Sequence, residues 1–508
     1  MPRRPSWVSF GDLNAFFALL LDNVVNLVLM SGILAFGFGM PIDFVLARMV
    51  PGTALGVLLG DLAYTWMAIR KGKGATAMPL GLDTPSTIAM SVAVIGPVFL
   101  QSGDPIVAWE VGMATLFLMG IAKTLLAFVG DAVTRVLPAA ALLGPIAGVG
   151  LALMGLFPVL KIFSLPIAGI VAMGLVLYGL TAGHVLPFRL PAALVAVVAG
   201  AILAFVSVLA GLSPEHAATP MDLGFHPPLL QPAHLWAGLP RALDFLPISI
   251  PLGILTIVGG INVSASAREA GDDYRTRDIL LVEAVATLVA GAFGGVAQST
   301  PYIGHPAYKA MKARAGYTLA TGLVIGVLGT FGLLGMVVDA LPAVAVAPIL
   351  LFVGIEICVQ AFRVPPARHH AAVVVSIVPA LAYLVSIYTG QLLSAGAQPG
   401  PVLADEVETI AILGRGFILT SMLWGAATAW LVDRRPLPVL LAFLALAAFS
   451  LFGVIHSADP DGALVVPWDA PTTTPRQLAA AYAATGGLLA CLLRFTRPGA
   501  PVLARDSG

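Results

Sequence analysis

The sequence predicts an all-α polytopic membrane protein, built as a seven-plus-seven inverted repeat with two broken helices and two extra C-terminal spans. The first observation is composition: of 508 residues, 59% are hydrophobic and 10% are charged, against roughly 45–50% and about 25% in soluble domains. The second is a series of apolar blocks of span length. The third is a Thr-Pro motif at the same place in each half. These observations exclude a soluble protein.

A bilayer core about 30 Å thick needs a helix of about 20 apolar residues, and short Gly/Pro-rich or charged joints separate such blocks here. The expected spans are 15–36, 43–69, 77–102, 106–130, 137–158, 165–183, 190–211, 246–267, 278–297, 299–313, 315–339, 342–361, 370–393, 411–432, 436–456 and 476–493. The transporter unit is expected to cover 1–432, and 433–508 to hold two additional spans with a short tail. Polar residues such as Asp22 interrupt the first block, so we interpret it as a span and not a secretory signal.

The basic residues gather on one side of the predicted membrane. If the N-terminus is cytoplasmic, the basic clusters at 268–277 and 309–314 fall inside, whereas the acidic loop at 405–408 falls outside. The positive-inside rule then predicts a multi-pass protein of a bacterial-type inner membrane with both termini in the cytoplasm. The net charge is zero, so we expect no nucleic-acid partner.

The Thr-Pro motif marks two expected helix breaks, in LGLDTP at 80–85 and in AQSTPY at 297–302. Thr suits a helix N-cap and Pro the first helical position. We therefore expect 78–82 and 294–298 to be extended and to lead into short helices. Seven spans per half would invert the second half, and inverted repeats with discontinuous helices indicate a transporter site near the bilayer midplane. The alternative is that Thr-Pro only kinks two ordinary spans.

The chain resembles the xanthine/uracil/ascorbate permeases, the second nucleobase:cation symporter family, over roughly 15–432. The residues that carry the resemblance are LDN at 21–23, PLGLDTP at 79–85, SASAREAG at 264–271 and GGVAQSTP at 294–301. The resemblance implies that substrate lies between the third and tenth segments and that the protein is a homodimer. Anion exchangers of the sulfate-permease type share this architecture.

The same resemblance implies two moving parts. The core domain would contain about 15–130 and 246–339, and the gate domain about 137–211 and 342–432. The eighth span differs from the family pattern because 251–267 contains no acid where members usually place a carboxylate. Its polar groups are instead Thr256 and Asn262.

Asp83 is the leading candidate for the site, because an ionisable group at mid-membrane is costly and usually functional. Its alternative role is to cap the adjacent short helix. Gln298, Ser299 and Thr300 carry amide and hydroxyl groups that match either the edge of a heterocycle or an oxyanion. The other candidates for substrate contact are Thr84, Tyr302, Thr256, Asn262, Asp22 and Asn26.

Proton coupling is expected at Asp83, His305 or Glu283. Three acids fall within predicted spans and belong either to a proton path or to structural ion pairs; they are Asp61, Glu283 and Glu356. Lys123, also within a span, is a candidate partner for one of them, or it extends toward the membrane interface.

The leading functional prediction is secondary-active, proton-coupled uptake of a xanthine-, uracil- or purine-like base by alternating access. The alternative is an anion transporter or exchanger of the same fold, because two facing helix N-termini favour an anion and the missing carboxylates would help. Sodium is the second candidate for the coupling ion. We expect no enzyme activity, cofactor or metal site, since the motifs for nucleotide binding, metal ligation and nucleophilic catalysis are missing from the sequence.

Overall fold

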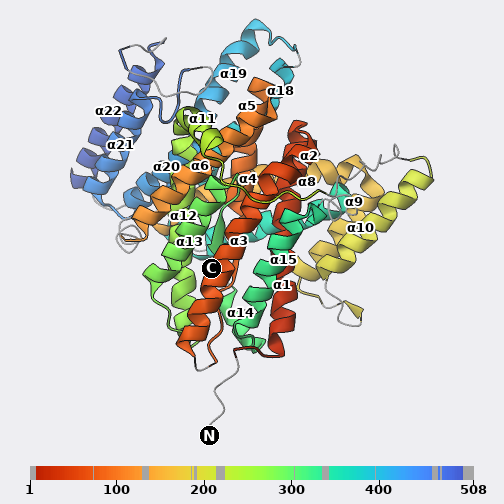
Figure 1. Cartoon of the computed structure of the whole chain (residues 1–508). Coiled ribbons are helices and arrows are strands. Elements are labelled where there is room, and N and C mark those ends of the chain that lie inside the picture. The colour runs from red at the N-terminus through yellow and green to blue at the C-terminus, as the bar shows by residue number, and fades with distance from the viewer. Residues whose placement is uncertain are drawn as a thin grey trace. The chain divides into compact units, whose positions relative to one another are not determined.

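The computed structural model describes residues 7–72, 74–128, 137–184, 186–187, 192–212, 224–302, 304–334, 342–394, 396–459, 467–468 and 472–495. Over these residues the regular secondary structure is helical apart from one pair of three-residue strands, β1 (Leu80–Leu82) and β2 (Ser299–Pro301) (Figure 1). The chain packs into two compact units. Unit 1 contains residues 1–133 and 161–348, and unit 2 contains residues 134–160 and 349–508.

Unit 1 begins with the helices of the first four predicted spans. They are α1 (Gly11–Gly32) with η1 (Ile33–Gly37), α2 (Ile42–Phe44) with η2 (Val45–Met49), α3 (Val50–Lys71), α4 (Thr84–Met90) with η3 (Ser91–Ile95) and α5 (Gly96–Ser102), and α6 (Pro105–Leu126). Local chemistry explains several ends. Asp104 caps α6 by accepting a hydrogen bond from Ile106 N at 2.8 Å. Gly72 ends α3 with a φ of 65°, which favours glycine.

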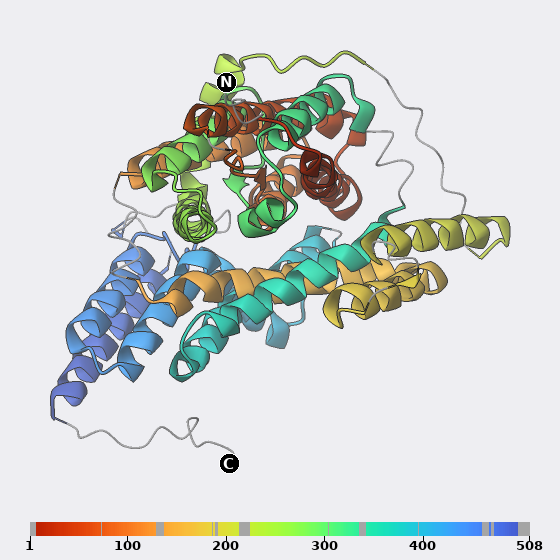
Figure 2. The same ribbon diagram turned by 90° about the horizontal axis from the view of Figure 1, so that it is seen from below.

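The rest of unit 1 contains the helices of the second half and one separate helix pair. The elements are α9 (Pro166–Val176) with η4 (Leu177–Thr181), α10 (Ala192–Leu209), α11 (Pro232–Ala242) with η6 (Leu243–Phe245), α12 (Leu246–Glu269), α13 (Thr276–Ala292), α14 (His305–Ala310) and α15 (Gly316–Thr330). α9 and α10 lie side by side (Figure 2). Two further helices, α8 (Ala139–Ser164) and α17 (Ala343–Arg363), contribute residues to both units.

The centre of unit 1 depends on close helix packing. α3 packs against α13 and α15, and α6 packs against α12 and α13. A Cβ atom at Gly52 would collide with the backbone of Phe293 and Gly295, and one at Gly291 would lie 2.8 Å from Phe117 N. Small residues allow such close contact between backbones. This packing matters in a membrane, because the hydrophobic effect does not drive helices together in lipid. These contacts position the chain that leads into β2.

The two strands pair antiparallel, with Gly81 opposite Thr300. The pairing extends beyond β1, because Asp83 N donates to Gln298 O at 3.0 Å. Non-helical backbone at membrane depth is tolerated only where the protein satisfies its polar groups. The two breaks therefore satisfy one another, and the prediction of two broken helices is confirmed.

The other edge of β1 is satisfied by side chains of α1. Leu82 N donates to Asn23 Oδ1 at 3.1 Å, while Asn23 Nδ2 lies 3.4 Å from Leu80 O. Asn26 Nδ2 lies 3.4 Å from Leu82 O. The amide of Asn23 thus presents one donor and one acceptor to the strand, as a third strand would. This contact explains why the first span contains asparagines in an otherwise apolar block.

The second broken segment differs from the prediction in where its helix begins. The Thr-Pro pair at 84–85 starts α4 as expected, but the pair at 300–301 lies in β2, and α14 begins only at His305. Tyr302 N donates to Pro79 O at 2.8 Å. Strand pairing therefore continues past the Thr-Pro pair and delays the helix. The predicted helical span 299–313 is wrong at its N-terminal end.

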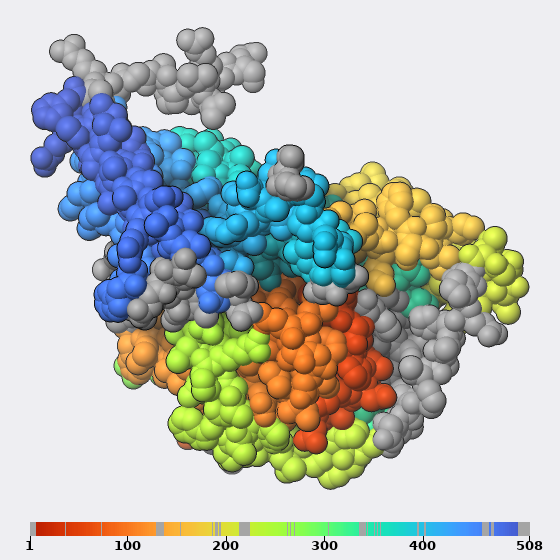
Figure 3. Space-filling model, turned by 90° about the horizontal axis from the view of Figure 1, so that it is seen from above, coloured from red at the N-terminus to blue at the C-terminus, as the bar shows by residue number. Residues whose placement is uncertain are grey.

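Unit 2 contains the last helices of the repeat and the two appended helices. The elements are η7 (Ala367–His369), α18 (His370–Ser394), α19 (Pro401–Gly414), α20 (Phe417–Val432), α21 (Pro436–Leu451) and α22 (Thr474–Phe495). The chain bends by 74° between α19 and α20, where Gly416 adopts a φ of 68°. α21 and α22 pack side by side, and Figure 3 shows them in blue on the surface.

Among the described residues, eight helices are long and apolar enough to cross a membrane, or nine with the bent α19–α20 pair. Several other predicted spans correspond to shorter apolar helices; they are Pro166–Thr181, Val195–Leu209, Gly316–Thr330 and Pro436–Leu451. The compact unit 1 contains residues 161–211 together with the segments predicted as the core domain. The sequence analysis placed 137–211 in the gate domain. The division into core and gate concerns movement and stays a prediction.

Candidate functional site

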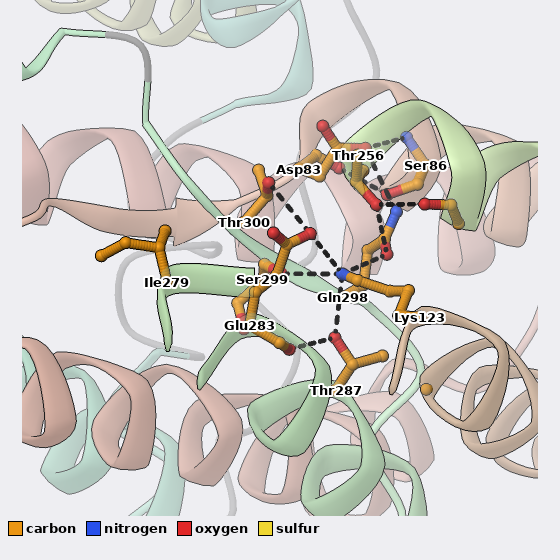
Figure 4. Close-up of polar contacts among 12 residues, drawn as sticks. Asp83, Ser86, Lys123, Thr256, Ile279, Glu283, Thr287, Gln298, Ser299 and Thr300 are labelled. Carbon is orange, nitrogen blue, oxygen red and sulfur yellow. Dashed lines mark hydrogen bonds and ion pairs between the residues drawn. The ribbon is translucent and has the colours of Figure 1, made fainter. Parts of the chain in front are cut away.

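Polar residues of unit 1 converge where the two broken segments meet (Figure 4). We call this group the crossing cluster: Asp83 between β1 and α4, Lys123 on α6, Thr256 on α12, Glu283 and Thr287 on α13, and Gln298 and Ser299 at the start of β2. All of these residues are buried except Asp83, which is half-buried. The cluster therefore joins both halves of the repeat through side chains.

Lys123 lies at the centre of the crossing cluster. Its Nζ is 2.6 Å from Glu283 Oε1, and it donates to Gln298 Oε1 at 2.9 Å and to Thr287 Oγ1 at 3.2 Å. A weaker contact reaches Ser299 O at 3.3 Å. Both side chains of the ion pair are 0% exposed, and burying two charges is tolerated only with a close partner and further hydrogen bonds. Lys123 also lies in the last turn of α6, where the helix dipole favours a cation.

Glu283 and Thr287 are presented to Lys123 by one face of α13. Residues four apart lie on the same side of a helix, and Thr287 Oγ1 also donates to Glu283 O at 2.9 Å. Thr300 Oγ1 donates to Glu283 Oε1 at 3.3 Å. A Cβ atom at Gly260 on α12 would lie only 3.0 Å from Glu283 Oε2. Glycine at 260 therefore leaves the space that the carboxylate occupies.

Asp83 and Gln298 link the ion pair to the start of α4. Asp83 Oδ2 accepts a hydrogen bond from Ser86 N at 3.0 Å, so the carboxylate caps the helix, as its alternative role predicted. Gln298 Nε2 lies 3.5 Å from Asp83 Oδ2, and Thr256 Oγ1 lies 3.5 Å from Gln298 Oε1. The amide of Gln298 therefore bridges the cation on one side and the helix cap on the other.

Two buried oxygens of the cluster have no hydrogen-bond partner among the described residues. They are Glu283 Oε2 and Ser299 Oγ. Buried polar atoms are nearly always paired, because an unpaired one costs about 1–3 kcal/mol. Two such atoms beside one buried cation indicate a place where a ligand or a proton can bind.

Several predicted site residues lie outside the crossing cluster. Asp22 and Asn26 lie on α1 beside β1, where Asn26 binds the strand backbone. Tyr302 is 40% exposed and contacts the Tyr308 ring. Thr84 is the first residue of α4 and half-buried. The roles of these four residues in substrate binding stay predictions, and the side chains of Asn262 and Glu356 lie outside the described part of the chain.

His305 belongs to a second polar group, which we call the loop cluster: Asp272, His305 and Lys309. His305 Nε2 lies 3.1 Å from Asp272 Oδ2, and Lys309 Nζ lies 2.8 Å from the same oxygen. Burial alone would raise the pKa of Asp272, but hydrogen bonds and charge from His305 and Lys309 lower the pKa below its ordinary value. Asp272 Oδ2 also accepts a hydrogen bond from Thr76 N at 3.3 Å. The predicted coupling role of His305 is untested, and its contacts tie α14 to the chain before β1.

The sequence did not identify Lys123 as the centre of the site. Lys123, Glu283 and Gln298 come from three distant segments, and only their fold brings them together. The available signal was a single lysine in a predicted span together with an acid in another span, since such groups rarely remain unpaired in a membrane. This signal does not say which acid pairs with the lysine. Asp61 is also an acid in a predicted span, yet neither of its buried carboxylate oxygens has a hydrogen-bond partner among the described residues.

A cavity in unit 2 adds no polar site to the two clusters. A cavity of about 450 Å³ lies within unit 2 and is lined mainly by apolar side chains; the lining residues are Val375, Trp424, Ala427, Thr428, Leu431, Phe443, Leu478, Ala481, Tyr482 and Thr485. No group of three or more His, Cys, Asp or Glu residues in the described ranges is placed to hold a metal ion. The crossing cluster is the candidate site.

Solved structures share this fold. No protein-family model matches the chain, and no curated protein matches it. The transmembrane domain of a cyanobacterium bicarbonate transporter, BicA, is 16% identical with a TM-score of 0.51, and the match covers 77% of this chain and 99% of that one. The murine Solute Carrier 26 family member A9 anion transporter in the inward-facing state is 15% identical with a TM-score of 0.52, covering 78% and 68%. A further SLC26A9 structure is 13% identical with a TM-score of 0.52, and the match covers 76% of this chain and 65% of that one.

These matches correct the resemblance to the xanthine/uracil/ascorbate permeases, which is wrong at the level of family. The matching structures belong to a different group of transporters with the same seven-plus-seven fold. The segments 79–85 and 294–301 that suggested the permeases form the broken helices, which are features of the fold and not of one substrate. The chain is therefore a multi-pass membrane protein with the seven-plus-seven inverted-repeat fold that these solved structures share.

Proposed function

We propose that this protein transports a small anion across the membrane by alternating access. The observation that carries the proposal is the buried ammonium group of Lys123 beside the two broken segments. A cation shielded from water attracts an anion more strongly than an exposed one, because Coulomb interactions strengthen as the local dielectric constant falls. The structural neighbours described as a bicarbonate transporter and an anion transporter support the same class of substrate.

The groups around Lys123 favour a small oxyanion. The Gln298 amide and the Ser299 hydroxyl can donate hydrogen bonds to oxygen atoms while Lys123 supplies the charge. Bicarbonate is therefore the first anion to test, with chloride and sulfate beside it.

The membrane arrangement of the proposal follows the sequence predictions. The segments predicted as the core carry the crossing cluster and move against the segments predicted as the gate, in a homodimer in a bacterial-type inner membrane. Both termini are expected in the cytoplasm. A C-terminal reporter that is active only in the periplasm would contradict this topology.

Ligand-dependent thermal stability of the purified protein tests the proposal. A ligand at 100 times its Kd stabilises the folded state by about 2.7 kcal/mol, so we expect bicarbonate or another small anion to raise the melting temperature, and xanthine and uracil to leave it unchanged. The stabilisation should disappear in Lys123→Gln and persist in Lys312→Gln, which removes an exposed lysine. Stabilisation by none of the anions would contradict the proposal.

A further inference from the structure

Glu283 occupies the position beside Lys123 that a bound anion would need. Four oxygen atoms surround Lys123 Nζ, and the Glu283 carboxylate is the charged one among them and the nearest, at 2.6 Å. An ammonium group has three hydrogens to donate, so these oxygens already use its capacity. Because Lys123 is 0% exposed, an anion can reach it only by displacing an oxygen that is already bound.

The charge of the cluster determines which oxygen can leave. With Glu283 and Asp83 ionised, one ammonium lies near two carboxylates, and an added anion would bring a third negative charge beside an ion pair whose side chains are 0% exposed. Uncompensated buried charge is very costly. If Glu283 takes up a proton as the anion arrives, the total charge of the cluster stays the same. Proton and anion binding are then linked by electrostatics.

The surroundings of Glu283 provide a place for that proton. Oε1 faces Lys123 and Thr300, whereas Oε2 has no hydrogen-bond partner among the described residues. A proton can therefore bind at Oε2 without breaking an existing hydrogen bond.

The other titratable groups that face Glu283 come from known elements. They are Lys123 from α6, Asp83 from the turn between β1 and α4, and Tyr64 from α3, whose hydroxyl donates to Ile279 O at 3.0 Å. Asp61 lies one turn from Tyr64 on the same helix. α12 presents Thr256 and Gly260 to this side, so it adds no charge. Lys123 is thus the only cation that faces Glu283 from the described elements.

We propose that Glu283 is an internal substitute for the transported anion. When a proton from the solution binds Glu283 Oε2, the neutral acid releases Lys123, the anion binds the freed ammonium, and proton and anion cross the membrane together. Release of both lets the Glu283 carboxylate return to Lys123. This inference rests on the proposed anion transport and adds its coupling: one proton for each monovalent anion, with no sodium required.

Transport by the full chain in lipid vesicles tests the coupling. Wild-type protein should accumulate labelled chloride, or another non-volatile monovalent anion found by thermal shift, when the donor side is acidic and sodium is absent; bicarbonate is unsuitable here because acid converts it to CO2, which crosses lipid without a transporter. Glu283→Gln imitates the protonated acid permanently, so we expect anion exchange between equal concentrations to continue while accumulation driven by a pH gradient is lost. The matched control is Glu110→Gln, on the same helix as Lys123 but paired with His234 at 2.7 Å; it should behave as wild type.

Binding measurements distinguish the possible failures. In wild type we expect the apparent Kd to fall up to tenfold for each unit of decreasing pH, as one linked proton requires, and to be independent of pH in Glu283→Gln. The double variant Lys123→Gln/Glu283→Gln removes both charges of the ion pair, so neither is left without the other, and it should fold but bind no anion. Gradient-driven accumulation by Glu283→Gln, or a sodium requirement in wild type, would overturn the coupling alone. A wild-type protein that binds no anion at any pH would overturn the proposed function itself.

Discussion

The crossing cluster and the loop cluster contain the same kinds of groups but differ in their access to water. In the crossing cluster, Lys123 and Glu283 are both 0% exposed. In the loop cluster, Asp272 is 4% exposed, but the Lys309 side chain that binds it is 33% exposed. Each cluster joins a part of the first half to a part of the second half of the repeat.

The difference teaches what each cluster can do. In the loop cluster, water can replace a lost partner of Lys309, so the pair holds α14 in place without depending on a ligand. In the crossing cluster, only another protein group or a ligand can replace a lost partner, because the site excludes water. A buried pair is a weak source of stability, but it can exchange partners with a substrate. The crossing cluster is therefore suited to binding and the loop cluster to structure.

The largest effect on the free energy of unfolding is expected when one member of the buried Lys123–Glu283 pair is removed. Lys123→Ala or Glu283→Ala should lower the free energy of unfolding by about 3–5 kcal/mol, because each leaves an uncompensated charge in the protein interior. Reversible denaturation in detergent would measure the loss. The double variant Lys123→Ala/Glu283→Ala should lose clearly less than the sum of the single variants. Additive losses would show that the two groups do not depend on one another.

A smaller loss is expected in the loop cluster. Asp272→Ala removes the acceptor of Thr76 and the partner of both His305 and Lys309. It should cost about 1–3 kcal/mol, because His305 and Thr76 are left as buried donors without a partner while the charged Lys309 can still reach water. Asp273→Ala, at the neighbouring position, is the control, since the Asp273 side chain is 74% exposed and should contribute little. If Asp272→Ala were as costly as loss of the buried pair, water access would not explain the difference between the clusters.

The fold was largely predictable from the sequence. Span-length apolar blocks and the break at 80–85 depend on local properties, namely hydropathy and the helix-starting chemistry of Thr-Pro. The second break was harder to predict. The Thr-Pro sequence at 300–301 has the same local chemistry, but it forms a strand that pairs with β1 and does not start a helix. Strand pairing between segments about two hundred residues apart overrode the local preference there.

The site was less predictable than the fold. Gln298 and Ser299 were expected because they follow a break, and both lie in the crossing cluster. The pairing of Lys123 with Glu283 was not predictable, because three acids in predicted spans were equivalent candidates and only packing of α6 against α13 decides among them. Asn26 of α1 was expected from the sequence to contact substrate, and in the structure its amide lies 3.4 Å from Leu82 O at the edge of β1.

The pH dependence of stability sharpens the comparison further. The pKa of Asp272 is lowered in the folded protein, so its contribution to stability is complete above the unfolded pKa of about 4 and is lost as pH falls through the lower folded value. The wild-type melting temperature should therefore fall as the pH drops below about 4, the ordinary pKa of an aspartate, and Asp272→Asn should reduce this fall. Melting curves of both proteins at matched ionic strength would measure it. An equal fall in both proteins would assign the acid sensitivity to other carboxylates.

The smallest effect is expected at an ion pair with full access to water. Arg268 Nε lies 2.9 Å from Asp273 Oδ1, with side chains 57% and 74% exposed. Exposed pairs contribute about 0–1 kcal/mol and are screened by salt, so Arg268→Gln should change the free energy of unfolding by less than about 1 kcal/mol. The same substitution removes one positive charge from the cluster at 268–277 that predicts the cytoplasmic side. If the variant inserts poorly into the membrane but the inserted protein keeps its stability, this arginine acts in setting the topology. If the inserted protein instead loses much of its stability, access to water does not set the strength of these ion pairs.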